Sequence, residues 1–150
     1  MRVNVGVDPK TLTDEHLIAE ARELIMLPYF CNKCKETGSM KNIPEKFTLG
    51  QGHILFFTNK VKYVCDRYLK ILDECKNRNI NMVNKSNKFV PLCWEHGGWN
   101  NWQPDLNDLN LIISRICDRI QSSPKKEFHY NHKKITKDQA ILLIQQNLYY

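Results

Sequence analysis

Acidic, imidazole and guanidinium side chains recur at helical spacing near the start of this chain. His16, Glu20 and Glu23 occupy positions i, i+4 and i+7, so they share one face of a helix. Carboxylate and imidazole groups held together are typical of general acid–base chemistry. A solvated charged face is the simpler interpretation, because charged side chains are common on protein surfaces. The rest of the chain has to decide between the two.

The segment that carries this stripe is predicted to be a helix over about residues 13–26. Thr11 or Thr13 can cap its first turn, and Asp14 and Glu15 suit the positive end of the helix dipole. The helix is expected to end before Pro28. Its apolar face, on the side away from the stripe, consists of Leu17, Ile18, Ala21, Leu24 and Ile25.

Basic side chains gather in two further places. Arg115 and Arg119 are i, i+4 neighbours on a predicted helix, and Lys125 and Lys126 begin a segment, 125–134, in which lysines and histidines alternate with aromatic residues. That composition suits phosphate contact and base stacking, although a solvated basic loop is the alternative. A net charge of +6 favours an anionic partner, nucleic acid above all.

Four residues could form a zinc site of the Cys₃His type. They are Cys31, Cys34, Cys93 and His96. The two pairs lie about sixty residues apart and only one contains two cysteines, so we expect neither a metal nor a cofactor. A small zinc-stabilised scaffold remains an alternative.

The chain is expected to form one all-α domain over residues 1–150. Its length allows a substantial core, and 42% hydrophobic with 25% charged residues indicates a globular protein. We predict three main helices and a short C-terminal helix, with no strand-rich block, and regard 135–150 as a C-terminal extension. The expected helices are 13–26, 54–78, 105–121 and 137–147, with long irregular loops over 28–46 and 79–104.

The polar N-terminus predicts no secretory signal, and no apolar run approaches the length of a membrane span. Reduced cysteines are therefore expected. We expect a monomeric cytoplasmic protein of a prokaryotic or infected host cell, with no membrane association.

Two blocks carry a resemblance to a known family. HLIAEAREL at 16–24 and FTLGQGHILFFTNK at 47–60 closely resemble the phage pyrimidine-dimer DNA glycosylases, also called endonuclease V of T-even phages, in order and spacing. SRICDRI at 114–120 is similar to the last long helix of that family. The resemblance is good over 1–24 and 43–80, fair over 105–124 and poor over 28–42 and 82–104.

This resemblance implies a compact, mostly helical, metal-free enzyme that removes a damaged base and then cleaves the abasic site. The α-amino group of the first residue attacks C1′ of the damaged nucleotide and forms an imine, and a glutamate of the first helix is essential. Here those groups are the amine of Met1 and the carboxylate of Glu23. The residues expected to contact the substrate or the kinked duplex, from which a base is flipped, are Arg2, His16, Glu20, Arg22, Arg115, Arg119, Lys125 and Lys126.

Three departures from the phage pattern stand out. The phage proteins carry a threonine before the arginine, whereas Met1 directly precedes Arg2 here. A residue as large as arginine normally blocks removal of Met1, so the Met1 amine falls where the threonine amine would be. Ile25-Met26-Leu27 stands where the phage pattern has another arginine, and segment 125–134 is altered; both bear on lesion preference.

A homologue without catalytic activity is the alternative from another class. A cationic pocket for a flipped nucleotide could bind DNA or sequester a small nucleotide. The tryptophan-rich loop at 92–102 and the additional C-terminal helix are what such a change would look like. Retention of Glu23 argues against it, because a carboxylate near phosphates does little for binding alone.

Overall fold

The computed structural model describes residues 1–95 and 98–149, with the backbone alone for residues 93–95. Within these residues the chain forms seven α-helices and one two-stranded antiparallel hairpin, which confirms the mostly-α class. The elements are α1 (Asp14–Leu24), α2 (Leu27–Thr37), α3 (His53–Phe57), α4 (Val61–Asn77), α5 (Val90–Glu95), α6 (Leu106–Ser122), β1 (Glu127–Tyr130), β2 (Lys133–Thr136) and α7 (Lys137–Gln145).

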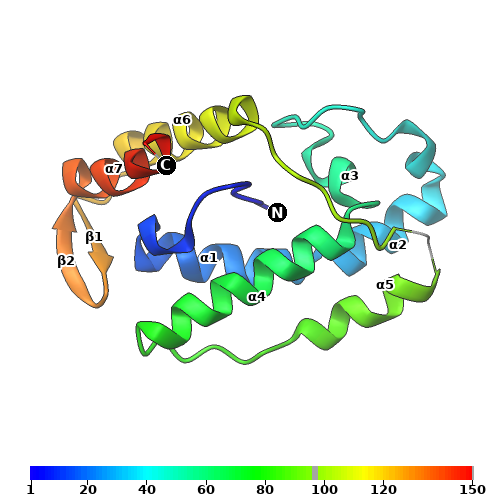
Figure 1. Cartoon of the computed structure of the whole chain (residues 1–150), viewed down its shortest axis with the longest axis horizontal. Coiled ribbons are helices and arrows are strands. Elements are labelled where there is room, and N and C mark those ends of the chain that lie inside the picture. The colour runs from blue at the N-terminus through cyan, green and yellow to red at the C-terminus, as the bar shows by residue number, and fades with distance from the viewer. Residues whose placement is uncertain (96–97, 150) are drawn as a thin grey trace.

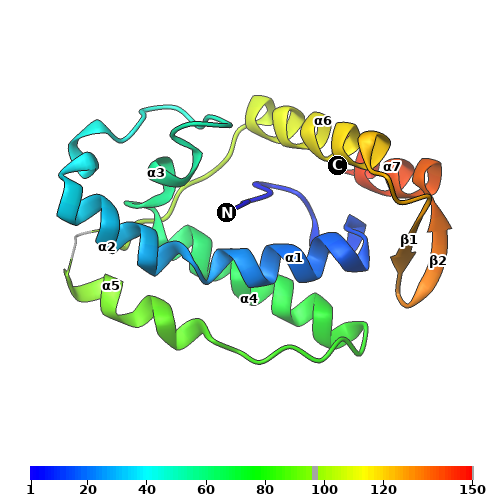
Figure 2. The same ribbon diagram turned by 180° about the vertical axis from the view of Figure 1, so that it is seen from behind.

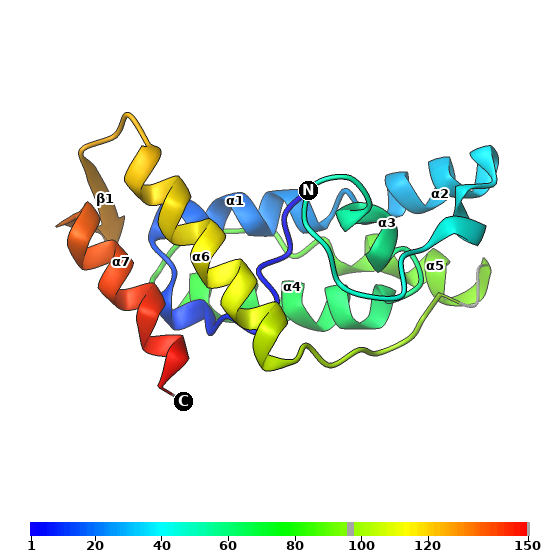
Figure 3. The same ribbon diagram turned by 90° about the horizontal axis from the view of Figure 1, so that it is seen from above.

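The helices enclose the N-terminal arm, residues 1–8. α1 packs against α4 on one side of it, and α6 packs against α7 on the other (Figure 1). The reverse view shows the same arrangement, with the chain's first residues at the centre of the molecule (Figure 2). The N-terminus lies beside α1 and the loop that leads into α3 (Figure 3). An arm of this kind needs no partner strand, because side chains of the helices surround it.

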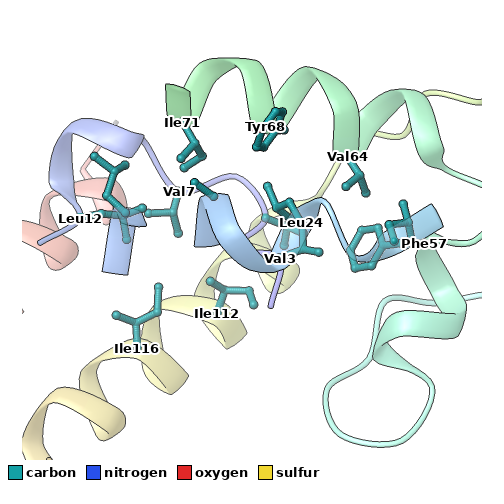
Figure 4. Close-up of a cluster of buried hydrophobic side chains, with 14 of the residues drawn as sticks. Val3, Val7, Leu12, Leu24, Phe57, Val64, Tyr68, Ile71, Ile112 and Ile116 are labelled. Carbon is teal, nitrogen blue, oxygen red and sulfur yellow. The ribbon is translucent and has the colours of Figure 1, made fainter. Parts of the chain in front are cut away.

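Alternating valines anchor the arm in the core. Val3, Val5 and Val7 are completely or almost completely buried, and so is Asn4, because the arm turns at Val5 and Gly6 instead of running as an extended strand. Each valine buried in this way contributes about 1.5–3 kcal/mol. The arm therefore belongs to the core, together with Leu12, Leu24, Phe57, Val64, Tyr68, Ile71, Ile112 and Ile116 (Figure 4).

The prediction for residues 25–46 was wrong in its first part. α1 ends at Leu24, and a second helix, α2, begins at Leu27 where we expected irregular structure. Pro28 lies in the first turn of α2, where its missing N–H costs nothing, so it starts a helix instead of preceding a loop. Gly38, with a φ of 72°, ends α2 in the left-handed conformation.

The single helix predicted over 54–78 is two helices, α3 and α4. Thr58 interrupts them, since its hydroxyl donates to the carbonyl of Leu55 at 2.6 Å. The N–H of Val61 donates to Gly98 O at 3.0 Å. The first N–H of α4 is therefore satisfied by a segment distant in sequence and not by the preceding turn. A side chain at Gly98 would place its Cβ 2.9 Å from the carbonyl oxygen of Thr58, which explains the glycine there.

The connection over 79–104 is less irregular than predicted, because it contains α5. Trp102 packs onto the body of the protein, with its ring 5.1 Å from that of Phe56 and 5.8 Å from that of Phe47. Trp102 therefore covers part of the core.

The basic segment 125–134 forms the hairpin β1–β2, which we did not predict. Asn131 and His132 have positive φ angles of 49° and 66° and make its two-residue turn. Their backbone N–H groups donate to the Asp14 carboxylate at 3.0 and 2.8 Å. Glu15 accepts from the backbone N–H and from Nδ1 of His129, the latter at 2.7 Å. Part of this segment therefore fastens the hairpin to the start of α1.

The last two helices begin as their sequences predict. Asp105 and Asp108 form a capping box at α6, and Thr136 and Gln139 form one at α7. Among the described residues, no helix combines the length and the apolar character needed to cross a bilayer.

Candidate active site

The stripe on α1 faces the arm and not the solvent. Glu20 is 1% exposed, and its carboxylate accepts the backbone N–H of Asn4 at 3.0 Å and the Asn4 side-chain amide at 2.8 Å. Arg67 of α4 donates to the same carboxylate through Nε at 2.7 Å and Nη2 at 3.1 Å. Glu20 therefore links the arm to α4, and both of its carboxylate oxygens accept hydrogen bonds from within the protein.

Glu23 lies one turn further along α1 and is bound differently. Its Oε1 lies 3.5 Å from Nε of Arg2, and both side chains are partly exposed. Its Oε2 is buried and has no hydrogen-bond partner among the described residues. A buried carboxylate oxygen without a partner is unfavourable for stability, and such atoms in native proteins often serve a function. The structure thus brings Glu23 together with the start of the chain.

Arg115 enters the site from α6. Its Nη2 donates to Oδ1 of Asn4 at 3.2 Å, so the Asn4 side chain joins Glu20 to α6. Burial, together with the guanidinium groups of Arg119 and Arg2, lowers the pKa of Arg115 to about 10. Its Nε is the other buried side-chain atom of the described chain that lacks a partner. The side chain as a whole is only partly buried and also lines a groove on α6, where its charge can attract an anionic group.

A groove of about 300 Å³ lies along α6 beside these groups. Arg115 and Arg119 contribute its positive charge. Its described lining consists of Leu49, Leu111, Ser114, Arg115, Asp118, Arg119 and Ser122. The two arginines are the groups in this groove that suit a phosphate, whereas Leu49 and Leu111 are apolar and Asp118 is acidic.

His16 begins the stripe and is neutral at physiological pH. Burial, followed by the charge of Arg2, lowers its pKa to about 4. Its Nδ1 forms a hydrogen bond with the Thr13 hydroxyl at 2.6 Å, and its ring stacks on Phe128 with 5.8 Å between centroids. His16 therefore joins the helix cap to the hairpin at the edge of the site.

The remaining basic residues of the prediction lie on the surface. Arg22 is exposed on α1, on the turn that carries Glu23. Lys125 and Lys126 are exposed directly before β1, and no contact among the described residues joins them to Glu23. Of the predicted set, six residues are linked to one another by contacts or charge effects among the described residues: Arg2, His16, Glu20, Glu23, Arg115 and Arg119.

His53 is a site residue that the sequence did not lead us to expect. It is 4% exposed, and its Nε2 accepts the backbone N–H of Val3 at 3.3 Å. Burial, Arg115 and the N-terminal charge lower its pKa to about 4. Two signals pointed to it in the sequence: its place in the 47–60 block that carries the family resemblance, and its position after Gly50 and Gly52.

The proposed zinc ligands are described only in part. Cys31 and Cys34 both lie on α2, and Cys31 Sγ donates to the carbonyl of Thr58 at 3.7 Å. Burial raises the pKa of Cys31 to about 12, so it is a thiol and not a thiolate. The side chain of Cys93 and all of His96 lie outside the described residues, and the described ones contain no group of three potential metal ligands.

The arrangement can therefore perform acid–base and electrostatic chemistry around the first residue of the chain. It offers a carboxylate with a free oxygen, two arginines on α6 and an arm held in the core. One comparison with known proteins bears on this. A family model described as pyrimidine dimer DNA glycosylase matches residues 1–88, more than half of the chain, and so includes the arm, α1 and α3. The chain belongs to the pyrimidine dimer DNA glycosylase family, whose members are DNA repair enzymes that act on damaged DNA.

Proposed function

We propose that this protein removes the base at a pyrimidine dimer or a related lesion and then cleaves the abasic strand, with the α-amino group of Met1 as nucleophile. The carboxylate of Glu23 carries the proposal, because it lies beside Arg2 and its buried Oε2 has no partner in the part of the chain that the structure describes. An α-amino group ordinarily titrates near 8, about two pH units below lysine, so it supplies a neutral amine more readily.

The first step exchanges one bond at C1′ for another. The neutral amine attacks C1′, the glycosidic C–N bond breaks, and the base keeps the electron pair of that bond and takes up a proton. The sugar ring then opens, O4′ takes up a proton, and the nitrogen forms a protonated imine with C1′. Glu23 is suited to carry protons in this step, because Oε2 is free to accept one.

The second step is a β-elimination. A base removes a proton from C2′, and the 3′ phosphate leaves with the electron pair of the C3′–O bond. Water then hydrolyses the imine and restores the amine. Glu23 also serves as the base for C2′ in this proposal.

The arginines bind the phosphates that flank the lesion. Arg115 and Arg119 line the α6 groove, and Arg22 is exposed on the turn of α1 that carries Glu23. Lys125 and Lys126 extend the positive surface onto the hairpin. Extrusion of a base costs a few kcal/mol, and least at a damaged pair, which favours lesions over intact DNA.

The test is a single-turnover strand-cleavage assay on a duplex with one pyrimidine dimer. Untagged protein is compared with protein acetylated at the N-terminus and with Glu23→Gln. We expect the acetylated protein to be inactive and Glu23→Gln to be slower by about 10²–10⁴-fold, the usual contribution of acid–base catalysis. Tight binding without cleavage by untagged protein, unaffected by acetylation, would instead support a binding protein that has lost activity.

A further inference from the structure

The hydrogen bonds of the N-terminal arm come from helix side chains. Asn4 is held by Glu20, and the N–H of Gly6 donates to the Tyr63 hydroxyl at 3.4 Å. Val3 N–H donates to His53 Nε2 at 3.3 Å. Of the backbone hydrogen bonds that hold the arm in the described chain, this one lies nearest to the N-terminal amine.

The His53 ring is itself fixed from three sides. Its Nδ1–H donates to the carbonyl oxygen of Thr48 at 2.9 Å, which leaves Nε2 as the acceptor. The rings of Phe47 and Phe57 meet it edge-on, with centroids 5.5 and 5.3 Å away. Gly52, with a φ of 90°, caps the helix that His53 begins. The imidazole therefore has one orientation and points one nitrogen at the arm.

The charges around His53 keep this nitrogen an acceptor. Arg115 and Arg119 of α6 and the N-terminal ammonium group all disfavour a proton on the ring, and burial disfavours it most. A protonated ring would carry N–H groups on both sides and would oppose the N–H of Val3. The hydrogen bond to Val3 is thus compatible with neutral pH.

We propose that His53 is a positioning residue that fixes the N-terminal α-amino group relative to Glu23 by accepting the backbone N–H of Val3. The proposal rests on the proposed function, in which that amine is the nucleophile. Met1 and Arg2 alone separate the Val3 nitrogen from the α-amino group, which is at most about 7 Å of chain. Movement of Val3 after loss of its hydrogen bond to His53 therefore also moves the amine. Misplacement by about 1 Å can cost on the order of 100-fold in rate.

Two amide variants separate this role from general support of the loop. His53→Asn keeps a group near Nδ1, within reach of Thr48, and loses the acceptor for Val3. His53→Gln extends an amide to the position of Nε2, where its oxygen can accept. We expect His53→Asn to form the imine with an abasic duplex about 10- to 100-fold more slowly, and His53→Gln to recover most of the rate.

The assay has two readouts. The rate of covalent adduct formation under borohydride reports on the amine, and the dissociation constant for a duplex with a tetrahydrofuran abasic analogue, which forms no imine, reports on binding. We expect the dissociation constant to stay within about twofold for both variants. Equal rates for wild type and His53→Asn, or equal losses of rate with His53→Asn and His53→Gln, would overturn the proposal.

Val3 provides an independent variant if His53→Asn does not fold. Val3→Pro removes the N–H donor. Val3→Ala keeps the donor and gives up the two buried γ-methyl groups of valine, so it shows the cost of lost packing with the hydrogen bond intact. We expect Val3→Pro to be at least about tenfold slower than Val3→Ala in adduct formation. Equal rates of adduct formation by Val3→Pro and Val3→Ala would overturn the positioning role of His53 and leave the proposed function standing. Absence of an adduct in the wild-type protein would overturn the proposed function as well.

Discussion

Glu20 and Glu23 lie one turn apart on the same stripe of α1, but their carboxylates differ in how the protein binds them. Asn4 and Arg67 bind both oxygens of Glu20, whereas Oε2 of Glu23 is buried without a partner among the described residues. A carboxylate that is fully bound by the protein stabilises the fold, and a buried one without a partner needs an explanation. At the scale of single residues, Glu20 is thus structural, and the proposed mechanism gives Glu23 the reactive role.

This difference predicts that two matched substitutions change stability by very different amounts. Glu20→Gln leaves the buried guanidinium of Arg67 without its counter-charge, and we expect a loss of about 3–5 kcal/mol in the free energy of unfolding. Glu23→Gln breaks no buried ion pair and should stay within about 0.5 kcal/mol of wild type. Urea denaturation of both variants checks this, and a Glu20→Gln protein as stable as wild type would contradict the structural role.

His53 shows the limit of sequence reasoning at this scale. The α1 stripe and the Arg2–Glu23 association follow from helical spacing and from the family resemblance. The bond from His53 to Val3 joins residues 50 positions apart, and periodicity carries no information about such a contact.

At the scale of elements, the proposed site draws on the arm, α1 and α6. In the proposed mechanism α1 supplies the carboxylate of Glu23, the arm supplies the amine, and α6 supplies Arg115 and Arg119. Helix caps and apolar faces predicted α1, α6 and α7 well. The break between α3 and α4 was missed because Gly98 O binds the N–H of Val61 from a distant segment, and the hairpin was missed because its turn depends on Asp14.

The position of Arg119 on α6 predicts a change in the salt dependence of DNA binding. Arg119 is exposed in the groove and makes no ion pair in the described chain. The logarithm of the DNA-binding constant falls linearly with the logarithm of the salt concentration. If Arg119 neutralises one phosphate, Arg119→Gln makes this slope less steep by about 0.9. Titrations of a labelled duplex at several salt concentrations measure this. Leu106→Gln, at the exposed start of the same helix, serves as a control and should leave the slope unchanged.

At the scale of the whole molecule, two neutral histidines, the buried His53 and the half-buried His16, link stability to pH. The pKa values of His16 and His53 are lowered from 6.5 to about 4 in the folded protein. Between these values the unfolded chain binds protons that the folded chain does not, so the free energy of unfolding falls as the pH drops from about 6.5 toward 4. Above pH 6.5 both histidines are neutral in the folded and in the unfolded chain, so they no longer change the free energy of unfolding with pH.

We expect the slope of this dependence to approach two protons, about 2.7 kcal/mol per pH unit, near pH 5. His53→Gln removes one of the two groups and should lower the slope by about one proton. Thermal or urea unfolding between pH 4.5 and 7 tests this, and stability independent of pH over that range would contradict the neutral state of both histidines.

The central claim is that the α-amino group of Met1 is the nucleophile, and peptide mapping of the trapped adduct tests it most directly. Untagged protein is incubated with a duplex that contains one abasic site, reduced with borohydride, digested and analysed by mass spectrometry. The account predicts the sugar adduct on the peptide that begins with Met1, at its amine, and no adduct after N-terminal acetylation. An adduct on a lysine side chain, or no adduct from protein with a free Met1 amine, would contradict it.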